Sequence, residues 1–289
     1  MIKTVLVPAS GSSTDDAVFA TALAAARALT AHLDFYHVAL STGQAAVRAP
    51  HVDFCIGEAL PAALQVVRDD TARLSEEAVR HFHAFRARHA LDLRDTPERA
   101  LTVSASFLEE KDYAQDRLRF HALHSDLVVL GRPSHTDYLP PHLIEDLLVG
   151  CGRPILIAPD YSPKTLPGTV VVGWKETAHC ARALAAAYPF LQKAEKVILL
   201  NIIEDGVDLS EALEHLTQRL QWHGIHAETQ SMAGTSRTIA KELARAAAGL
   251  HADLLVVGAY SHRHLREEIF GGVTQSLLEY ADLPVFMMY

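Results

Sequence analysis

An internal repeat limits what this chain of 289 residues can fold into. Residues 124–135 read HSDLVVLGRPSH and residues 251–262 read HADLLVVGAYSH, with the same His, Asp, Leu, Val, Gly, Ser and second His in the same order. Similar apolar segments open the two halves (TVLV at 4–7, TVVV at 169–172) and close them (RPILI at 153–157, LPVFM at 283–287). Because the order of these segments is kept, the whole unit is duplicated and the chain contains two copies of one domain.

The second half alternates short apolar segments with helical patterns. We predict strands at 170–172, 196–202, 225–231, 254–257 and 285–288, and helices at 177–191, 209–223, 236–249 and 273–281. Strands separated by helices of about 10 to 15 residues are typical of βαβ units and a parallel sheet. The sequence therefore predicts an α/β fold of two tandem doubly wound domains, each with a five-stranded parallel sheet.

The two halves differ in length. The opening segments are 165 residues apart (169 − 4) but the central repeats only 127 (251 − 124), so the first half holds about 38 extra residues. We assign them to an insertion at about 41–95, read as a long loop at 41–60 and an amphipathic helix at 69–89. The linker 160–168 contains two prolines and a glycine, so we predict domains at 1–160 and 168–289.

Charge and cysteine content narrow the expected partners and compartment. The formal net charge of -9 disfavours binding to a phosphate backbone, so we expect no nucleic acid partner. The three cysteines form no CxxC pair, which fits a reducing compartment, and we expect a cytoplasmic protein. Because no apolar run reaches about 18 residues and no signal-like segment opens the chain, we expect neither membrane insertion nor export.

The candidate ligand site lies where parallel strands end. After the predicted strand 254–257, Gly258 begins a loop that leads to Gly271 and Gly272 at the start of the next predicted helix. Free N–H groups at such a helix start can hold phosphate.

The stretch 258–274 resembles the nucleotide signature of the universal stress protein family: Gly, two residues, Gly, nine residues, Gly, then Ser or Thr. Gly258 and Gly271 keep this spacing, whereas Ser261 stands at the second Gly and Gly272 at the Ser or Thr. The resemblance also rests on Trp174-Lys175-Glu176-Thr177 and on the closing Leu283-Pro284-Val285, and it covers nearly the whole chain except the insertion.

The resemblance implies an adenine nucleotide alpha hydrolase-like fold and an adenine nucleotide, ATP or similar, with or without magnesium. The positions that it matches to ribose and triphosphate contacts are Gly258, Gly271, Gly272, Val273 and Thr274. Ser261 and His262 lie in the same loop. We interpret His262 either as a phosphate contact or as a local hydrogen bond that shapes the loop.

The resemblance also points to the loop after the first strand of each half, where the family commonly has an Asp that recognises adenine. Ser10 and Lys175 stand there instead. Two interpretations follow: the adenine is held near Trp174 and Lys175 mainly by backbone groups and apolar walls, or Lys175 favours a different anion. In the first half, Pro140 and Pro141 replace the glycines, and proline has no N–H to offer phosphate. We therefore predict one binding half and one structural half.

Several features have plainer interpretations. Residues 10–15 (SGSSTD) resemble the loop of adenylating enzymes only loosely, and we favour a helix N-cap. Asp126 and Asp253 precede a strand in both repeats, where a hydrogen bond that orders the loop is the better interpretation. Trp174 is expected to pack. The histidines form no recognisable ligand set, so we predict no metal site, and no catalytic set emerges.

The function implied is that of a tandem universal stress protein, a nucleotide-responsive sensor or regulatory binding protein. The alternatives are an adenylating or ATP-hydrolysing enzyme on the same fold, or a scaffold that binds no nucleotide. By the same resemblance the last strands, 155–158 and 285–288, pair across the domain interface in a pseudo-dimer, and two chains form a homodimer.

Overall fold

The computed structural model describes residues 1–40, 42–47, 59–96, 102–111, 114–132, 142–203, 209–234, 239–259, 276–278 and 280–289. The strands of the first half are β1 (Thr4–Pro8), β2 (His32–Val38), β3 (Asp92–Leu93), β4 (Ser104–Glu110), β5 (Leu127–Leu130) and β6 (Ile155–Ile157). Those of the second half are β7 (Thr169–Gly173), β8 (Lys196–Ile203), β9 (Ala227–Ala233), β10 (Leu254–Gly258) and β11 (Val285–Met288).

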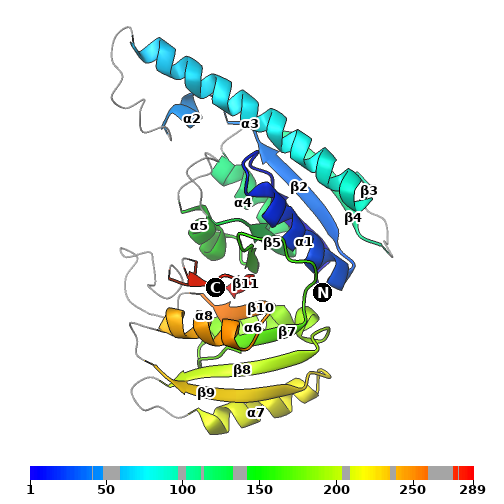
Figure 1. Ribbon diagram of the computed structural model, residues 1–289, viewed down its shortest axis with the longest axis vertical. Helices are drawn as coiled ribbons and strands as arrows, with labels where there is room; N and C mark the ends of the chain where they lie inside the picture. The colour runs from blue at the N-terminus through cyan, green and yellow to red at the C-terminus, as the bar shows by residue number, and fades with distance from the viewer. Residues whose placement is uncertain are drawn as a thin grey trace.

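These strands form one continuous sheet in the order β3-β4-β2-β1-β5-β6-β11-β10-β7-β8-β9 (Figure 1). Within each half all paired strands are parallel, which confirms the predicted fold class. The two-residue β3 is an addition to the first half. The halves join where β6 and β11 pair antiparallel, with Phe286 opposite Leu156, so the last strands meet as expected.

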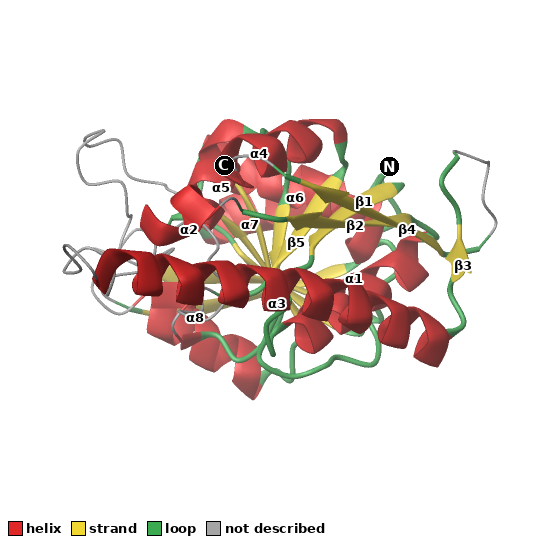
Figure 2. Ribbon diagram, turned by 90° about the horizontal axis from the view of Figure 1, so that it is seen from above, coloured by secondary structure: helices red, strands yellow, loops and turns green. Residues whose placement is uncertain are grey.

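Helices cover both faces of the sheet (Figure 2). They are α1 (Asp15–Leu29), α2 (Thr42–Val47), α3 (Ala59–His89), α4 (Ala114–His124) and α5 (Leu143–Gly150) in the first half, and α6 (Ala178–Leu191), α7 (Ser210–Gln221) and α8 (Ile239–Gly249) in the second. One core contains residues of α1, α3, α6 and α7, and the other contains residues of α4, α5 and α8. Successive strand residues alternate between these cores: Val5 and Val7 lie in the first, Leu6 in the second.

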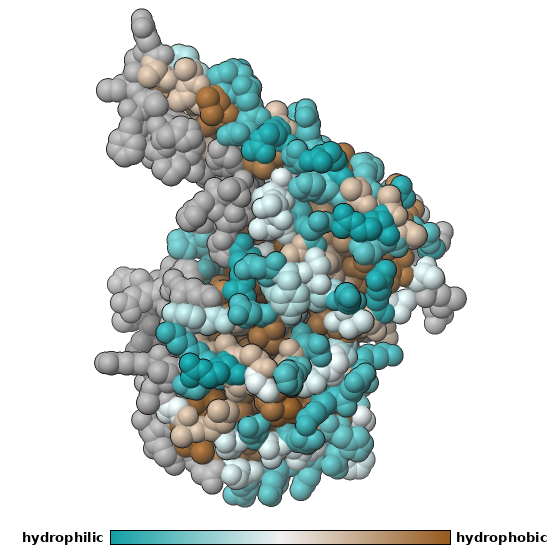
Figure 3. Space-filling view, in the orientation of Figure 1, coloured by the Kyte–Doolittle hydropathy of each residue, from teal (hydrophilic) through white to brown (hydrophobic). Residues whose placement is uncertain are grey.

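The insertion is more helical than the sequence suggested. The predicted loop contains α2, and α3 begins at Ala59 instead of residue 69. Pro61 lies in the first turn of α3, where a missing N–H costs no hydrogen bond, so it does not stop the helix. Val67 packs against Ala45 and Ala46 of α2. The helix pair extends beyond the sheet in Figure 1, and the outer side of α3 in Figure 3 is mainly hydrophilic.

The two repeated aspartates order the residues at the start of β1 and β7 by hydrogen bonds, as predicted. Oδ2 of Asp126 accepts hydrogen bonds from the backbone N–H groups of Lys3 (2.7 Å) and Thr4 (3.1 Å). Oδ2 of Asp253 accepts one from Thr169 (2.7 Å), the residue that opens the second half. Each aspartate thus fastens the start of the first strand of its own half to the strand beside it.

Within the described residues, each helix is too short or too polar to cross a membrane.

Candidate ligand-binding site

The carboxyl ends of two neighbouring strands define the candidate site in each half. In the second half β7 ends at Gly173 and β10, beside it, ends at Gly258. In the first half β1 and β5 have the same relationship. In both halves the chain leaves these neighbours for opposite sides of the sheet, which is where open α/β sheets bind ligands.

The structure describes three of the predicted site residues, Gly258, Trp174 and Lys175. The others lie outside the described residues: Ser261, His262, Gly271, Gly272, Val273 and Thr274. The loop with Pro140 and Pro141, on which the prediction of a structural first half depends, also lies outside them. The phosphate end of the candidate site therefore stays a prediction.

Gly258 has a packing role that the sequence motif did not reveal. A Cβ atom at this position would lie 2.5 Å from the backbone N of Cys180 and 2.7 Å from the carbonyl carbon of His179. The start of α6 thus crosses the end of β10 too closely for any side chain. Glycine is required here whether or not a nucleotide binds.

The loop between β7 and α6 carries Trp174 and Lys175. Thr177 is the N-cap of α6, and its Oγ1 accepts a hydrogen bond from N of Cys180 (3.2 Å). Lys175 is exposed, and its carbonyl accepts from N of Thr177 (2.7 Å). Trp174 is half-buried and packs against the core, in agreement with the packing interpretation.

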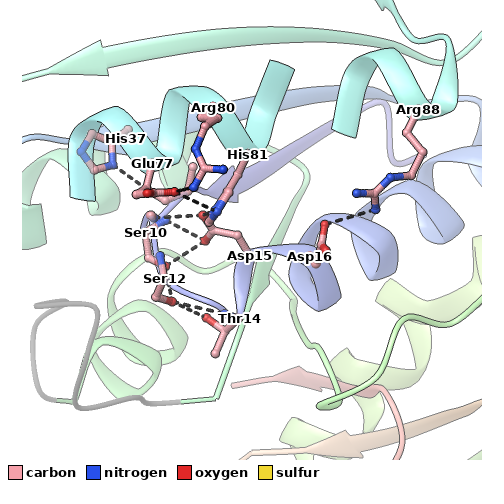
Figure 4. A network of polar contacts seen from close by, with 12 residues as sticks. Ser10, Ser12, Thr14, Asp15, Asp16, His37, Glu77, Arg80, His81 and Arg88 are labelled. Carbon is pink, nitrogen blue, oxygen red and sulfur yellow. Dashed lines mark hydrogen bonds and ion pairs between the residues drawn. The ribbon is translucent and has the colours of Figure 1, made fainter. Parts of the chain in front are cut away.

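The corresponding loop of the first half is closed by its own side chains (Figure 4). Asp15 is buried, and its carboxylate accepts hydrogen bonds from N and Oγ of Ser10 (2.9 and 2.8 Å) and from N of Gly11 (2.9 Å). Nδ1 of His81, on α3, lies 3.0 Å from Oδ2 of Asp15. The segment does contain the N-cap residue of α1, Thr14, but the expected capping bond from its side chain is not formed.

Helix α3 lies directly on this loop. Gly11 has φ of +76°, and a Cβ atom there would lie 2.0 Å from the carbonyl oxygen of Leu74. At the end of β2, Nδ1 of His37 lies 2.7 Å from O of Ala9 and Nε2 lies 2.9 Å from Oγ of Ser75. Helix α3 therefore fills the space above the ends of β1 and β2.

The second half has two buried donors at the corresponding place, and sequence reasoning missed one of them. Nε1 of Trp174 and Nδ2 of Asn201 are buried and have no hydrogen-bond partner within the described part of the chain. A groove of about 550 Å³ opens beside Trp174, between the β7–α6 loop and the start of α7. Asn201 could have been noticed as a polar residue inside the apolar run LLNII at 199–203.

A further polar cluster ties α4 to the ends of β2 and β4. Oε2 of Glu110 accepts hydrogen bonds from Oη of Tyr36 (2.7 Å) and Nε of Arg117 (2.6 Å). The bond from Tyr36 lowers the pKa of Glu110, and burial raises the pKa of Tyr36 above its usual value. Burial also lowers the pKa of His121, whose ring lies 4.2 Å from that of Tyr36. Nowhere in the described residues do three His, Cys, Asp or Glu side chains gather in a way that could hold a metal ion.

The fold and the position of the site define a class: two doubly wound α/β units, joined by their last strands into one sheet. Residues 168–288 match the model of the universal stress protein family. The second half of the chain therefore contains a domain that matches this family, and the first half repeats the same fold.

Solved structures share this architecture over the full chain. A universal stress protein from Archaeoglobus fulgidus matches 99% of this chain and 97% of its own, with a TM-score of 0.71 at 15% identity. A putative universal stress protein from Pseudomonas aeruginosa matches 99% of this chain and 93% of its own, with a TM-score of 0.55 at 14% identity. None of the curated proteins matches the chain.

Proposed function

We propose that this protein is a stress-response protein that binds an adenine nucleotide, ATP or similar, mainly in its second half. It acts as a sensor or regulatory binding protein with at most slow ATP hydrolysis. The family domain at 168–288 supports the proposal. The proposed phosphate contacts are the N–H groups of the loop and helix start at 258–274, which the resemblance to the family signature supports.

The observation that supports the proposal most strongly is that the carboxyl end of β1 is covered by a helix, whereas the carboxyl end of β7 lies beside an open groove. In the first half α3 covers the β1–α1 loop, and the contact between Gly11 and Leu74 leaves no room between them. In the second half the groove at Trp174 is open on the side where α7 begins. A ligand therefore has a way in at the second half only, as far as the described residues are concerned.

The assembly of two chains is a separate part of the proposal. The β6–β11 seam already pairs the last strands within one chain. A homodimer must therefore use another surface than this seam, and the nucleotide is expected to change its stability. Light scattering with and without ATP measures both.

The test is a calorimetric titration of the full chain with ATP, with and without magnesium. His262→Ala should weaken binding, since His262 lies in the proposed phosphate loop. His135→Ala, at the matching position of the first repeat, is the control and should leave the affinity unchanged. Equal effects of the two substitutions, or no binding to the unaltered chain, would contradict the proposal.

Turnover separates the proposal from its enzymatic alternative. Steady release of phosphate or pyrophosphate from ATP by the purified protein would favour an enzyme, and binding without turnover favours a sensor. If millimolar ATP and magnesium leave the melting temperature unchanged, the protein is a scaffold, because a bound ligand must stabilise the native state.

A further inference from the structure

Trp174 and Asn201 lie side by side at the ends of β7 and β8. N of Trp174 donates to O of Leu200 (2.8 Å), which places Trp174 next to Asn201 in the sheet. Both follow the alternation of Val172 and Leu199, so their side chains lie on the face covered by α6 and α7. Asn201 is only 2% exposed. Leaving its amide N–H groups and the indole N–H buried without a partner costs free energy, which a ligand can recover.

In the first half, the residue that corresponds to Asn201 has hydrogen-bond partners for its side chain. N of Ala9 donates to O of Tyr36 (2.9 Å), the same bond as between Trp174 and Leu200, so His37 corresponds to Asn201. Both ring nitrogens of His37 have partners, one of them Oγ of Ser75 on α3. A polar side chain stands at this place in both halves, but among the described residues only the first half supplies a hydroxyl as its partner.

Helices α3 and α7, which lie over His37 and Asn201, can be aligned by their C-terminal ends. Just after each helix, a backbone N–H donates to the carbonyl oxygen five residues earlier. N of Leu91 donates to O of Arg86 after α3 (3.1 Å), and N of Ile225 donates to O of Leu220 after α7 (3.0 Å). This alignment matches Ser75 with Leu209, the residue just before α7. A leucine has no hydroxyl, and α7 has no counterpart of the segment of α3 that precedes Ser75.

The groove occupies the place that this segment fills in the first half. Its walls include Trp174 and Glu176 on one side and Leu209, Glu211 and His215 of the α7 segment on the other. The same alignment matches Glu211 and His215 with Glu77 and His81. In the first half, His81 contacts the carboxylates of both Asp15 and Glu77. Asn201 belongs to β8, which pairs with β7 and precedes α7 in the chain. The groove has a volume of about 550 Å³, which is in the range of small-molecule sites.

We propose that Asn201, with Trp174 beside it, reads the base of a bound adenine nucleotide. This inference rests on the proposed function and assigns the part of it that Lys175 leaves open. A carboxamide presents a donor and an acceptor side by side, which matches the amino group and ring nitrogen of adenine. At the edge formed by position 6 and N7, an oxo-purine presents two acceptors in place of the donor and acceptor of adenine, which leaves the amide oxygen without a donor. The base enters past Trp174, so the indole changes its surroundings when the nucleotide binds.

The chain offers a direct probe of this step. It has two tryptophans, and Trp222 is 86% exposed on the far end of α7. In a Trp222→Phe background the emission of Trp174 is observed alone. Saturating ATP should shift this emission, and inosine triphosphate, which carries an oxo group in place of the amino group, should bind about tenfold more weakly.

Asn201→Leu is the decisive variant. It should bind the two nucleotides equally within about twofold, and its melting temperature without ligand should rise because no buried amide is left unpaired. His37→Leu is the matched control from the first half: it removes two satisfied contacts, so its melting temperature should fall while the preference for ATP is kept.

Two results would overturn the inference while leaving the proposed function intact. One is calorimetric binding of ATP with no change in Trp174 emission, and the other is a full preference for ATP retained in Asn201→Leu. A third result, no calorimetric binding of any nucleotide to the unaltered chain, would overturn the proposed function and the inference with it.

Discussion

Nε2 of His37 lies 2.9 Å from Oγ of Ser75, and this contact joins the end of β2 to the inserted helix α3. The corresponding residue of the second half, Asn201, has no partner for its amide nitrogen among the described residues. The repeat is thus asymmetric at one position of its ligand edge. In the first half, His37 makes hydrogen-bond contacts inside the protein, whereas in the second half the amide nitrogen of Asn201 has no such contact with a described residue.

The contact between α3 and the β1–α1 loop should make Gly11 intolerant of any side chain. Gly11→Ala places a Cβ atom 2.0 Å from O of Leu74 at a φ of +76°. Gly152→Ala is the control, since Gly152 also has positive φ (+61°) but no atom within 4 Å of the added Cβ. We expect about 1 kcal/mol of lost unfolding free energy for the control and clearly more for Gly11→Ala, measured by urea denaturation. Equal losses would mean that α3 does not lie on the loop.

Gly258 should matter for stability even without nucleotide. Gly258→Ala sets a Cβ atom against the backbone of Cys180 and His179, so we expect a loss of several kcal/mol, of the order seen for overpacked cores. Gly249→Ala, at the end of α8 with open space around it, should be neutral or raise stability by up to about 1 kcal/mol. Thermal unfolding in the absence of ligand measures both. A Gly258→Ala protein as stable as the parent would rule out the close crossing.

The two strand-ordering aspartates predict a graded loss. Asp126→Ala leaves the N–H groups of Lys3 and Thr4 without their acceptor, whereas Asp253→Ala leaves one N–H group in the described part of the chain, that of Thr169. At about 1 kcal/mol or somewhat more for each lost bond, Asp126→Ala should cost more than Asp253→Ala. Exposed Glu195→Ala is the reference for removing a surface carboxylate. The reverse order in chemical denaturation would show that these bonds do not set the stability of the strand ends.

The half-buried His121 of the α4 cluster predicts a pH dependence of stability. Burial lowers the pKa of His121 in the folded protein below the value of about 6.5 that it has when unfolded. The unfolded chain then binds more protons, so stability falls as the pH falls below about 6.5. His121→Gln should lose less unfolding free energy between pH 7 and pH 5.5 than the parent. Part of the dependence of stability on pH should remain in this variant, because burial also lowers the pKa values of His89 and His179. The exposed His226→Gln should leave it unchanged, and a His121→Gln slope equal to that of the parent would contradict the assignment.

Most of the fold followed from local patterns. The predicted helix 177–191 corresponds to α6 and the predicted strand 196–202 to β8, because periodicity and capping by Thr177 are properties of short segments. The repeat itself identified Asp126 and Asp253 as equivalent, and their shared role follows from that equivalence. The start of α3 was missed because a proline in a first turn looks the same in sequence as a proline in a loop.

The amino-acid sequence by itself determined the duplication and the parallel α/β class, since both depend on patterns repeated along the chain. The pairing of the last strands was expected only from the resemblance to the family. Only the tertiary structure decided that α3 closes the first strand end, that Gly258 is needed for packing, and that the amide nitrogen of Asn201 has no partner among the described residues. Each of these depends on which backbone comes within a few ångströms of another element, and that distance is set by the packing of the whole domain.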